Sequence, residues 1–137
     1  MPSISGIAET AVHVEDLARS LQFYQGLFGF KKIAADDRLV ALRVTRDQVF
    51  LIFKRNATLA PVETPGGTIP PHSTDGQAHF AFTIPHVEWD AWQQQVQSRG
   101  ITIESVVNWS PGVRSLYFRD PDGHLVELST PGLWKDE

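Results

Sequence analysis

The sequence contains no cysteine. A chain without cysteine cannot form a disulfide, a thiolate metal site or a cysteine nucleophile, so these three kinds of chemistry are excluded. The lack of cysteine is also compatible with the reducing cytoplasm, where we expect the protein to be located.

Long apolar runs and clusters of positive charge are missing as well. No stretch approaches the roughly 20 apolar residues of a membrane-spanning helix, and the first residues, MPSISGIAET, have neither the basic nor the apolar region of a signal peptide. The chain has 12 basic and 16 acidic residues, a net charge of −4, and no basic cluster. We therefore expect neither a membrane nor a nucleic acid among its partners.

The chain has 137 residues, of which 42% are hydrophobic, and this is the size and composition of one globular domain. Residues Ile7 to Val14 alternate between apolar and polar, which predicts a strand with one face against a core. Apolar residues then recur at helical spacing, with Asp16 as a candidate N-cap and Gly29 as a C-terminal stop. Three short strands are predicted next, at residues 31–35, 39–44 and 49–54.

The second half of the chain repeats this pattern. Residues 79–84, HFAFTI, alternate like the first strand, and a helix is expected to end at Gly100. The apolar face of this helix is expected to consist of Val87, Ala91, Trp92 and Val96. Further strands are predicted at residues 101–106, 113–119 and 125–129. The tight turn RDPDGH joins the last two, and we expect His124 at its end to be exposed.

Residues 60–77, APVETPGGTIPPHSTDGQ, interrupt the pattern with four prolines and three glycines. Such a composition predicts a loop. We interpret it as the connection between a first module at about residues 5–58 and a second at about 78–131, within a single domain that spans residues 1–137.

Alignment of the two halves brings polar residues into equivalent positions. A shift of 70 residues places Glu9 over His79, and a shift of 75 places Ile52 over Glu127. Glu127 stands between two apolar residues, where a carboxylate is costly to bury unless it is paired or coordinated. One imidazole and two carboxylates facing one cavity would suit a divalent cation with open positions. An isolated glutamate in a strand is, however, more often exposed or paired with arginine.

Three features together resemble the vicinal oxygen chelate superfamily, which includes glyoxalase I, extradiol dioxygenases, fosfomycin-resistance thiol transferases and bleomycin-binding proteins. They are the βαβββ repeat, the segment HVEDLARSLQFYQGLFGF, and the segment LYFRDPDGHLVELSTPG near the C-terminus. The resemblance spans roughly residues 6 to 131. It implies an α+β fold in which two tandem βαβββ modules form curled mixed sheets around a cavity. In chains of this length, it also implies a homodimer.

The resemblance further implies a metal site, with one ligand on the first strand of each module and a glutamate on the last strand. The matching residues are Glu9, His79 and Glu127, and in a homodimer Glu9 would come from the other subunit. Glu9 stands where relatives commonly have histidine, seven residues before Asp16. A fourth ligand of glyoxalase I corresponds to Ile52, which cannot coordinate, and this counts against glyoxalase I activity.

Two carboxylates and one imidazole would make a formally neutral site around a divalent ion. Such oxygen-rich ligation favours the harder ions Mn²⁺, Fe²⁺ and Mg²⁺, while Zn²⁺ and Ni²⁺ remain open. The positions left free on the ion would take two vicinal oxygens of a small-molecule substrate.

Four further residues are candidates for the site. His13 shares the strand face of Glu9 and is either an acid–base group or a partly buried, hydrogen-bonded histidine. Tyr117 matches a tyrosine that extradiol dioxygenases place near the metal, or it serves in packing. Arg114 is a candidate for binding an anionic substrate group or for pairing with an acidic neighbour. His72, in the loop, either closes over the cavity or is exposed to solvent.

These observations predict a divalent-metal-dependent enzyme that acts on a small oxygenated substrate by bidentate chelation. Its chemistry would be dioxygenase-like or lyase/isomerase-like, with thiol transfer left open. The alternative is a non-catalytic binding protein of the bleomycin-resistance type. In that case Glu9 and Glu127, in an aromatic-rich cleft, would hold a cationic drug without a metal.

Overall fold

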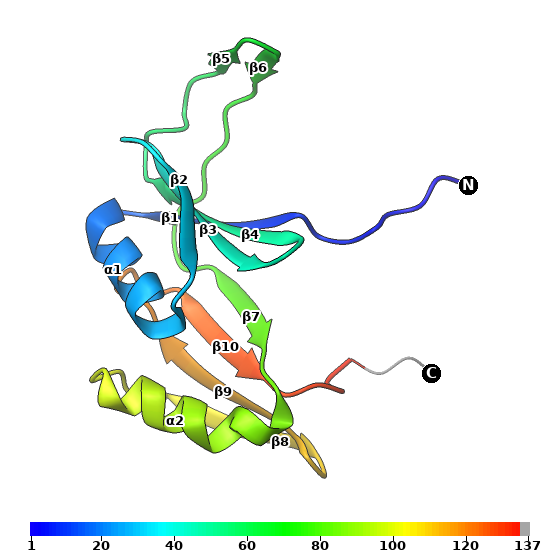
Figure 1. The fold of residues 1–137 in the computed structure, drawn as a ribbon. Helices are drawn as coiled ribbons and strands as arrows, with labels where there is room; N and C mark the ends of the chain where they lie inside the picture. The colour runs from blue at the N-terminus through cyan, green and yellow to red at the C-terminus, as the bar shows by residue number, and fades with distance from the viewer. Residues whose placement is uncertain (135–137) are drawn as a thin grey trace. The chain divides into compact units, whose positions relative to one another are not determined.

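The computed structural model describes residues 1–134. Its contacts divide the chain into two compact units, Met1–Gly76 and Gln77–Glu137. Figure 1 shows a curled sheet and a helix in each unit, which confirms the predicted α+β fold. Within residues 1–134, no helix is both long enough and apolar enough to cross a membrane.

The sheet of unit 1 has the strand order β1-β4-β3-β2, with β1 parallel to β4 and the other pairs antiparallel. Its elements are β1 (Glu9–Val14), α1 (Leu17–Phe28), β2 (Lys31–Ala35), β3 (Leu39–Thr45) and β4 (Gln48–Lys54). As predicted, Asp16 caps α1 by accepting a hydrogen bond from the Arg19 amide at 3.0 Å. Gly29 ends the helix in the left-handed conformation, at a φ of 70°.

The core of unit 1 lies between α1 and one face of its sheet. The ring of Tyr24 on α1 packs 4.7 Å from that of Phe50 on β4, and both residues are fully buried. Ile52 shares the face of Phe50, and its partner across the parallel pair, Val12, is buried with it. Burial of each such side chain stabilises the fold by about 1.5–3 kcal/mol. The period of two then leaves Glu9 on the opposite face of the sheet.

Unit 2 repeats this topology, with the strand order β7-β10-β9-β8 and β7 parallel to β10. Its elements are β7 (His79–Thr83), the 3₁₀ turn η1 (His86–Glu88), α2 (Trp89–Ser98), β8 (Ser105–Ser110), β9 (Val113–Arg119) and β10 (Leu125–Ser129). The bounds of β9 and β10 are those predicted from the sequence. The shared topology confirms that the chain contains two βαβββ modules.

Strand β8 differs from its predicted position at residues 101–106, because its partner strand decides where it lies. A two-residue turn at Pro111 and Gly112 pairs Ser110 with Val113, and Gly112 takes a positive φ of 78°. From this turn β8 runs back along β9 to Ser105. The apolar residues 101 and 103, which suggested an earlier strand, lie outside the ladder.

The apolar face of the second helix begins at Trp89 rather than at Val87, which corrects the sequence-based expectation. Residues His86–Glu88 form a 3₁₀ turn that leaves Val87 94% exposed. Trp89 and Val96 are the buried residues of α2. They are seven residues apart, about two helical turns, and therefore lie on one face.

The segment at residues 60–77 contains a short hairpin where an irregular loop was predicted. Its strands are β5 (Val62–Thr64) and β6 (Gly67–Ile69), joined by a two-residue turn. The hairpin projects away from the four-stranded sheet of unit 1 (Figure 1). Prolines on both sides of it have no amide hydrogen, which keeps both strands short.

Candidate functional site

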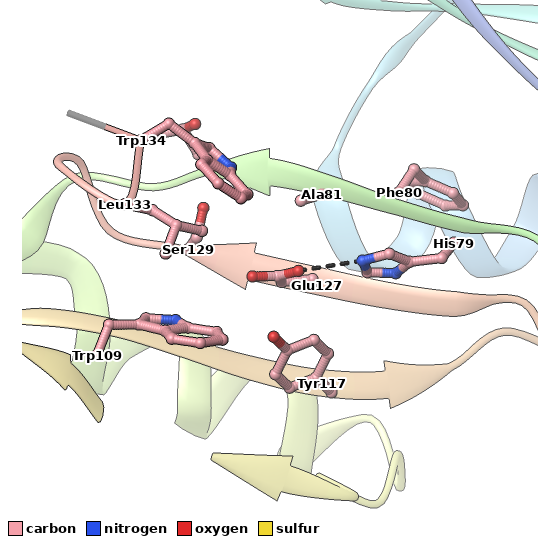
Figure 2. A pocket seen from close by; sticks show the side chains of 10 residues that line it. His79, Phe80, Ala81, Trp109, Tyr117, Glu127, Ser129, Leu133 and Trp134 are labelled. Carbon is pink, nitrogen blue, oxygen red and sulfur yellow. Dashed lines mark ion pairs between the residues drawn. The ribbon is translucent and has the colours of Figure 1, made fainter. Parts of the chain in front are cut away.

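A pocket of about 710 Å³ lies on one face of the unit 2 sheet (Figure 2). Its lining side chains come from β7, β8, β9, β10 and the segment that follows β10. The lining residues are His79, Phe80, Ala81, Thr83, Trp109, Tyr117, Glu127, Ser129, Leu133 and Trp134. Three of the seven residues proposed from the sequence, namely His79, Tyr117 and Glu127, are among them.

The register of the sheet brings these three residues together. Glu127 on β10 is paired with Tyr117 on β9 and with Ala81 on β7, and His79 precedes Ala81 by two residues. Because paired residues share a face and the side-chain period is two, all of them point to the same side. The result is an ion-pair geometry in which His79 Nε2 lies 3.2 Å from Glu127 Oε1 (Figure 2).

Glu127 is buried in this pocket and is held by a chain of hydrogen bonds. The Ser115 hydroxyl donates to Glu127 Oε2 at 2.6 Å, and the Trp109 indole N–H donates to Ser115 Oγ at 3.0 Å. An indole nitrogen can only donate, so the Ser115 proton is left to point at Glu127. Oε2 is therefore an acceptor, and Oε1 is the oxygen that faces His79.

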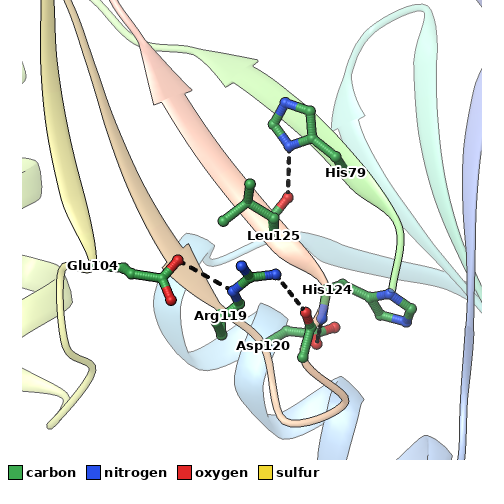
Figure 3. A network of polar contacts seen from close by, with 7 residues as sticks. His79, Glu104, Arg119, Asp120, His124 and Leu125 are labelled. Atoms are coloured by element: carbon green, nitrogen blue, oxygen red, sulfur yellow. Dashed lines mark hydrogen bonds and ion pairs between the residues drawn. The ribbon is translucent and has the colours of Figure 1, made fainter. Parts of the chain in front are cut away.

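His79 is held from its other side by the backbone. Its Nδ1 lies 3.0 Å from the Leu125 carbonyl oxygen, which can only accept (Figure 3). Nδ1 therefore carries a hydrogen, and in the neutral ring the lone pair is on Nε2. Hydrogen bonding of one ring nitrogen to a carbonyl is the usual way to aim the other nitrogen at a metal.

Two electron-pair donors thus face each other at 3.2 Å, His79 Nε2 and Glu127 Oε1. They repel unless a cation lies between them, either a proton on Nε2 or a metal ion. Adjacent ligands with bonds of about 2.1 Å to one ion lie roughly 3 to 3.4 Å apart. The observed separation fits this range, so the two residues suit a shared divalent ion.

Glu9, the third predicted ligand, belongs to the sheet of unit 1. It pairs there with Val49 at the register position that His79 occupies opposite Leu125 in unit 2, so the two residues are equivalent in their modules. Its side chain is exposed. Within residues 1–134 no three histidine, aspartate or glutamate side chains gather as a metal cluster. The structure thus brings together two of the three predicted ligands.

The equivalent of Glu127 in the first module is Leu51, and not Ile52 as the sequence alignment suggested. Ala11 pairs with Leu51 in unit 1 as Ala81 pairs with Glu127 in unit 2. Ile52 lies on the other face, fully buried in the core. The alignment was one residue out of register, and one residue changes the face of the sheet. Leu51 is as unable to coordinate as Ile52, so the absence of a fourth ligand stands.

Tyr117 lines the pocket beside Glu127, with its ring 6.2 Å from that of His79. Burial raises the pKa of its hydroxyl above the ordinary tyrosine value, and the negative charge of Glu127 raises the pKa further. Tyr117 is therefore protonated at neutral pH. It can donate a hydrogen bond or a proton, and it does not act as a base there.

Arg114 lies on the opposite face of β9, away from the pocket. Its guanidinium carbon stacks 4.5 Å from the centre of the Trp89 ring, against the start of α2. It is separated from Tyr117 by three residues, an odd number, so the strand period directs the two side chains to opposite faces. The structure thus places Arg114 in packing between helix and sheet and not in the lining of the pocket.

His13 and His72 lie together in unit 1. His13 is 4% exposed, its Nδ1 is 2.9 Å from the Thr74 hydroxyl, and its ring stacks on Phe53 at 5.4 Å. The His72 ring lies 5.3 Å from that of His13 and 4.6 Å from Phe53. Of the two alternatives for His13, its surroundings are those of a buried, hydrogen-bonded histidine.

His124 is buried, although the sequence suggested exposure. It is 1% exposed, its Nδ1 accepts a hydrogen bond from the Ala78 amide at 2.9 Å, and its amide donates to Asp120 Oδ1 at 2.8 Å. Arg119 closes the same turn by donating to the Gly123 carbonyl at 3.0 Å (Figure 3). This network fixes the residue immediately before His79.

Sequence reasoning missed Ser115 and gave Trp109 and Trp134 no role in the site. Ser115 precedes Tyr117 by two residues, so the strand period alone indicates a shared face. Nothing in the sequence indicates its bond to Glu127, because that bond joins neighbouring strands. Trp134 reaches the pocket only because the chain turns back after β10 (Figure 2).

The model of the glyoxalase/bleomycin resistance protein/dioxygenase superfamily matches residues 6–128. The crystal structure of a lactoylglutathione lyase from Agrobacterium tumefaciens is 32% identical in sequence and superposes with a TM-score of 0.88. The match covers 98% of this chain and 100% of that chain.

Two curated relatives carry other activities. The metallothiol transferase FosB of Bacillus licheniformis is 27% identical over 128 residues, which are 93% of this chain and 76% of that protein. The catechol-2,3-dioxygenase of Bacillus subtilis is 29% identical over 119 residues, 84% of this chain and 38% of that protein. These relatives are named for three different reactions, and all three are enzymes. The comparisons therefore favour an enzyme over the non-catalytic drug-binding alternative.

Proposed function

This chain belongs to the glyoxalase/bleomycin resistance protein/dioxygenase superfamily, and on that premise we propose that it is a divalent-metal-dependent enzyme. Its substrate would be a small molecule that presents two vicinal oxygens. The observation that carries the proposal is the 3.2 Å separation of His79 Nε2 and Glu127 Oε1, two donors that need a cation between them.

In this proposal His79 and Glu127 hold the ion, and Glu9 is the third ligand. Glu9 is chosen because it occupies the register position of His79 in its own module. One imidazole and two carboxylates suit Mn²⁺, Fe²⁺ or Mg²⁺, with Ni²⁺ and Zn²⁺ as further candidates. We propose that two chains form a homodimer, in which Glu9 of one subunit completes the site of the other.

A bound divalent ion would supply a Lewis acid that neutralises negative charge on a substrate oxygen. The residues of the chain have their own tasks beside it. The Tyr117 hydroxyl, protonated at neutral pH, donates a hydrogen bond to a substrate oxygen next to Glu127. Ser115 keeps Oε2 of Glu127 occupied, so that Oε1 alone is presented to the ion.

The reaction class that we propose is dioxygenase-like or lyase/isomerase-like. The apolar Leu51, at the position equivalent to Glu127, favours the dioxygenase-like chemistry. A lyase of the glyoxalase I kind would need a carboxylate for proton transfer, and Leu51 cannot provide one.

Metal binding by the full-length chain tests this function. We expect calorimetric titration to show micromolar or tighter binding of Mn²⁺ or Fe²⁺, and Glu127→Gln to weaken it by at least about 100-fold, since changes around a metal site commonly cost 10- to 100-fold. The matched control is Glu104→Gln, which alters an exposed glutamate paired with Arg119 at 3.3 Å. Equal affinity of the wild type and Glu127→Gln would remove Glu127 from the site, and no binding by the wild type would contradict the proposal.

A further inference from the structure

We propose that Trp109 and Trp134 form a subsite that binds a flat, uncharged aromatic ring of the substrate. The subsite belongs to the pocket of unit 2, so this inference rests on the proposed function and adds a substrate class to it. It follows from the placement of the two indoles, from the charges in the pocket and from the hydrogen bond of Trp109.

The two tryptophans stand on either side of β10 at one end of the pocket, beside Ser129 and Leu133 (Figure 2). His79 lies at the other end, with Glu127 between them. Trp109 is 51% exposed and Trp134 is 90% exposed. Exposed indoles that border a pocket are typical of binding surfaces, because each offers a large apolar area that a ligand can cover.

The side chains of the pocket disfavour an anionic group at this end. Its ten lining residues include no lysine and no arginine, and the carboxylate of Glu127 is the one fixed negative charge among them. Arg114, from the same sheet, stacks on Trp89 on the opposite face. An anion between the indoles would lose its hydration without gaining a cationic side chain as a partner, whereas an uncharged ring loses little.

The Trp109 ring is held in place before any ligand arrives. Its N–H donates to Ser115 Oγ at 3.0 Å, and Ser115 is fully buried and bonded to Glu127. The hydrogen bond uses the edge of the indole and leaves a ring face available for stacking. A ring that is already ordered loses little conformational entropy on binding, which favours a flat ligand.

Two probes separate this subsite from the metal function. Naphthalene-2-carboxamide carries a flat uncharged ring, and acetohydroxamate carries a chelating oxygen pair without a ring. Naphthalene-2-sulfonate has the same ring as the first probe but carries a negative charge. The affinity of each would be measured by calorimetry on the metal-loaded, full-length protein, for the wild type and for Trp134→Ala, Trp109→Leu and Trp109→Phe. Val87→Ala, which changes an exposed apolar residue on η1, is the control.

We expect the carboxamide to bind at least tenfold more tightly than the sulfonate. Trp134→Ala and Trp109→Leu should each weaken carboxamide binding by about fivefold, the size of one aromatic contact. Trp134→Ala should change acetohydroxamate binding by less than about twofold, because Trp134 lies outside the hydrogen-bond chain from Trp109 through Ser115 to Glu127. Trp109→Phe keeps a ring but loses the bond to Ser115, so its carboxamide affinity should lie between those of Trp109→Leu and the wild type. Val87→Ala should retain the wild-type affinity.

The subsite is overturned if the sulfonate binds as tightly as the carboxamide, or if Trp134→Ala leaves carboxamide affinity unchanged. It is also overturned if Trp134→Ala changes only the oligomeric state in gel filtration, because Trp134 would then serve contact between copies of the chain. If the wild type binds the carboxamide but not acetohydroxamate, the metal function is contradicted and the subsite is not.

Discussion

At the scale of single residues, the hydrogen bonds of the site are oriented by groups that can only donate or only accept. The Trp109 N–H can only donate and the Leu125 carbonyl can only accept, and both lie at the ends of the chain of contacts through Ser115, Glu127 and His79. The orientation of every group in between follows from these two ends. The arrangement leaves a lone pair on the nitrogen and on the oxygen that face each other, which is the property of a cation site.

Ser115 is the residue whose removal tests this chain most directly. Ser115→Ala should leave Trp109 Nε1 and Glu127 Oε2 without their partner and lower the free energy of unfolding by about 1–3 kcal/mol. It should also weaken metal binding by about tenfold, because Glu127 is then free to rotate. Urea denaturation measures the first effect and calorimetry the second.

The exposed Ser105 on β8 offers the control, and Ser105→Ala should change neither quantity. A Ser115→Ala variant with wild-type metal affinity would show that Ser115 contributes to stability alone.

At the scale of elements, the turn between β9 and β10 links strand pairing to the site. His124 at the end of this turn accepts a hydrogen bond from the Ala78 amide, and Leu125 donates to the Ala78 carbonyl at 2.8 Å. The strand that carries His79 is therefore fixed at Ala78, the residue immediately before its start, by the neighbouring turn. Gly123 permits the turn with a positive φ of 82°, a conformation that other residues rarely adopt.

His124→Ala should consequently affect metal binding without any contact to the ion. We expect it to lower the free energy of unfolding by about 2–3 kcal/mol, because it leaves the Ala78 amide unpaired and opens a small cavity. Metal affinity should fall by about tenfold as the start of β7 loosens. Urea denaturation and calorimetric titration of the same samples check both expectations.

His86→Ala is the matched control, because His86 is exposed on the turn before α2. An intact metal affinity in a destabilised His124→Ala protein would confine His124 to a role in folding.

At the scale of the whole molecule, the two modules share one topology and divide the proposed ligands between them. Glu9 lies in unit 1, while His79 and Glu127 lie in unit 2. In the proposed homodimer each site takes Glu9 from the other subunit, so variants with complementary defects should restore each other.

Mixing of Glu9→Ala and Glu127→Ala subunits tests this arrangement. After joint unfolding and refolding, random pairing makes half of the dimers mixed, and each mixed dimer has one intact site, so the mixture should regain about one quarter of the wild-type metal content. Elemental analysis after gel filtration measures it. A mixture that binds no more metal than the separate variants would place the three ligands on one subunit or remove Glu9 from the site.

Much of this protein follows from local spacing in the sequence. The positions of β1, β7, β9 and β10, the Asp16 cap and the Gly29 stop are properties of short segments, and the structure confirms them. The repeat of these segments, together with the motifs HVEDLARSLQFYQGLFGF and LYFRDPDGHLVELSTPG, resembles the superfamily, and this resemblance implied the α+β fold and made His79 and Glu127 candidates for one site.

The tertiary structure decided what depends on residues far apart in the chain. The position of β8 follows from its pairing with β9, and a one-residue error in aligning the modules exchanged Leu51 for Ile52. The burial of His124 and the bond from Ser115 to Glu127 likewise join separate strands. Periodicity indicates which face a side chain takes, whereas the contacts across a sheet depend on register. Register is set by turns and by the packing of the whole sheet, which is why these features appear only in the folded chain.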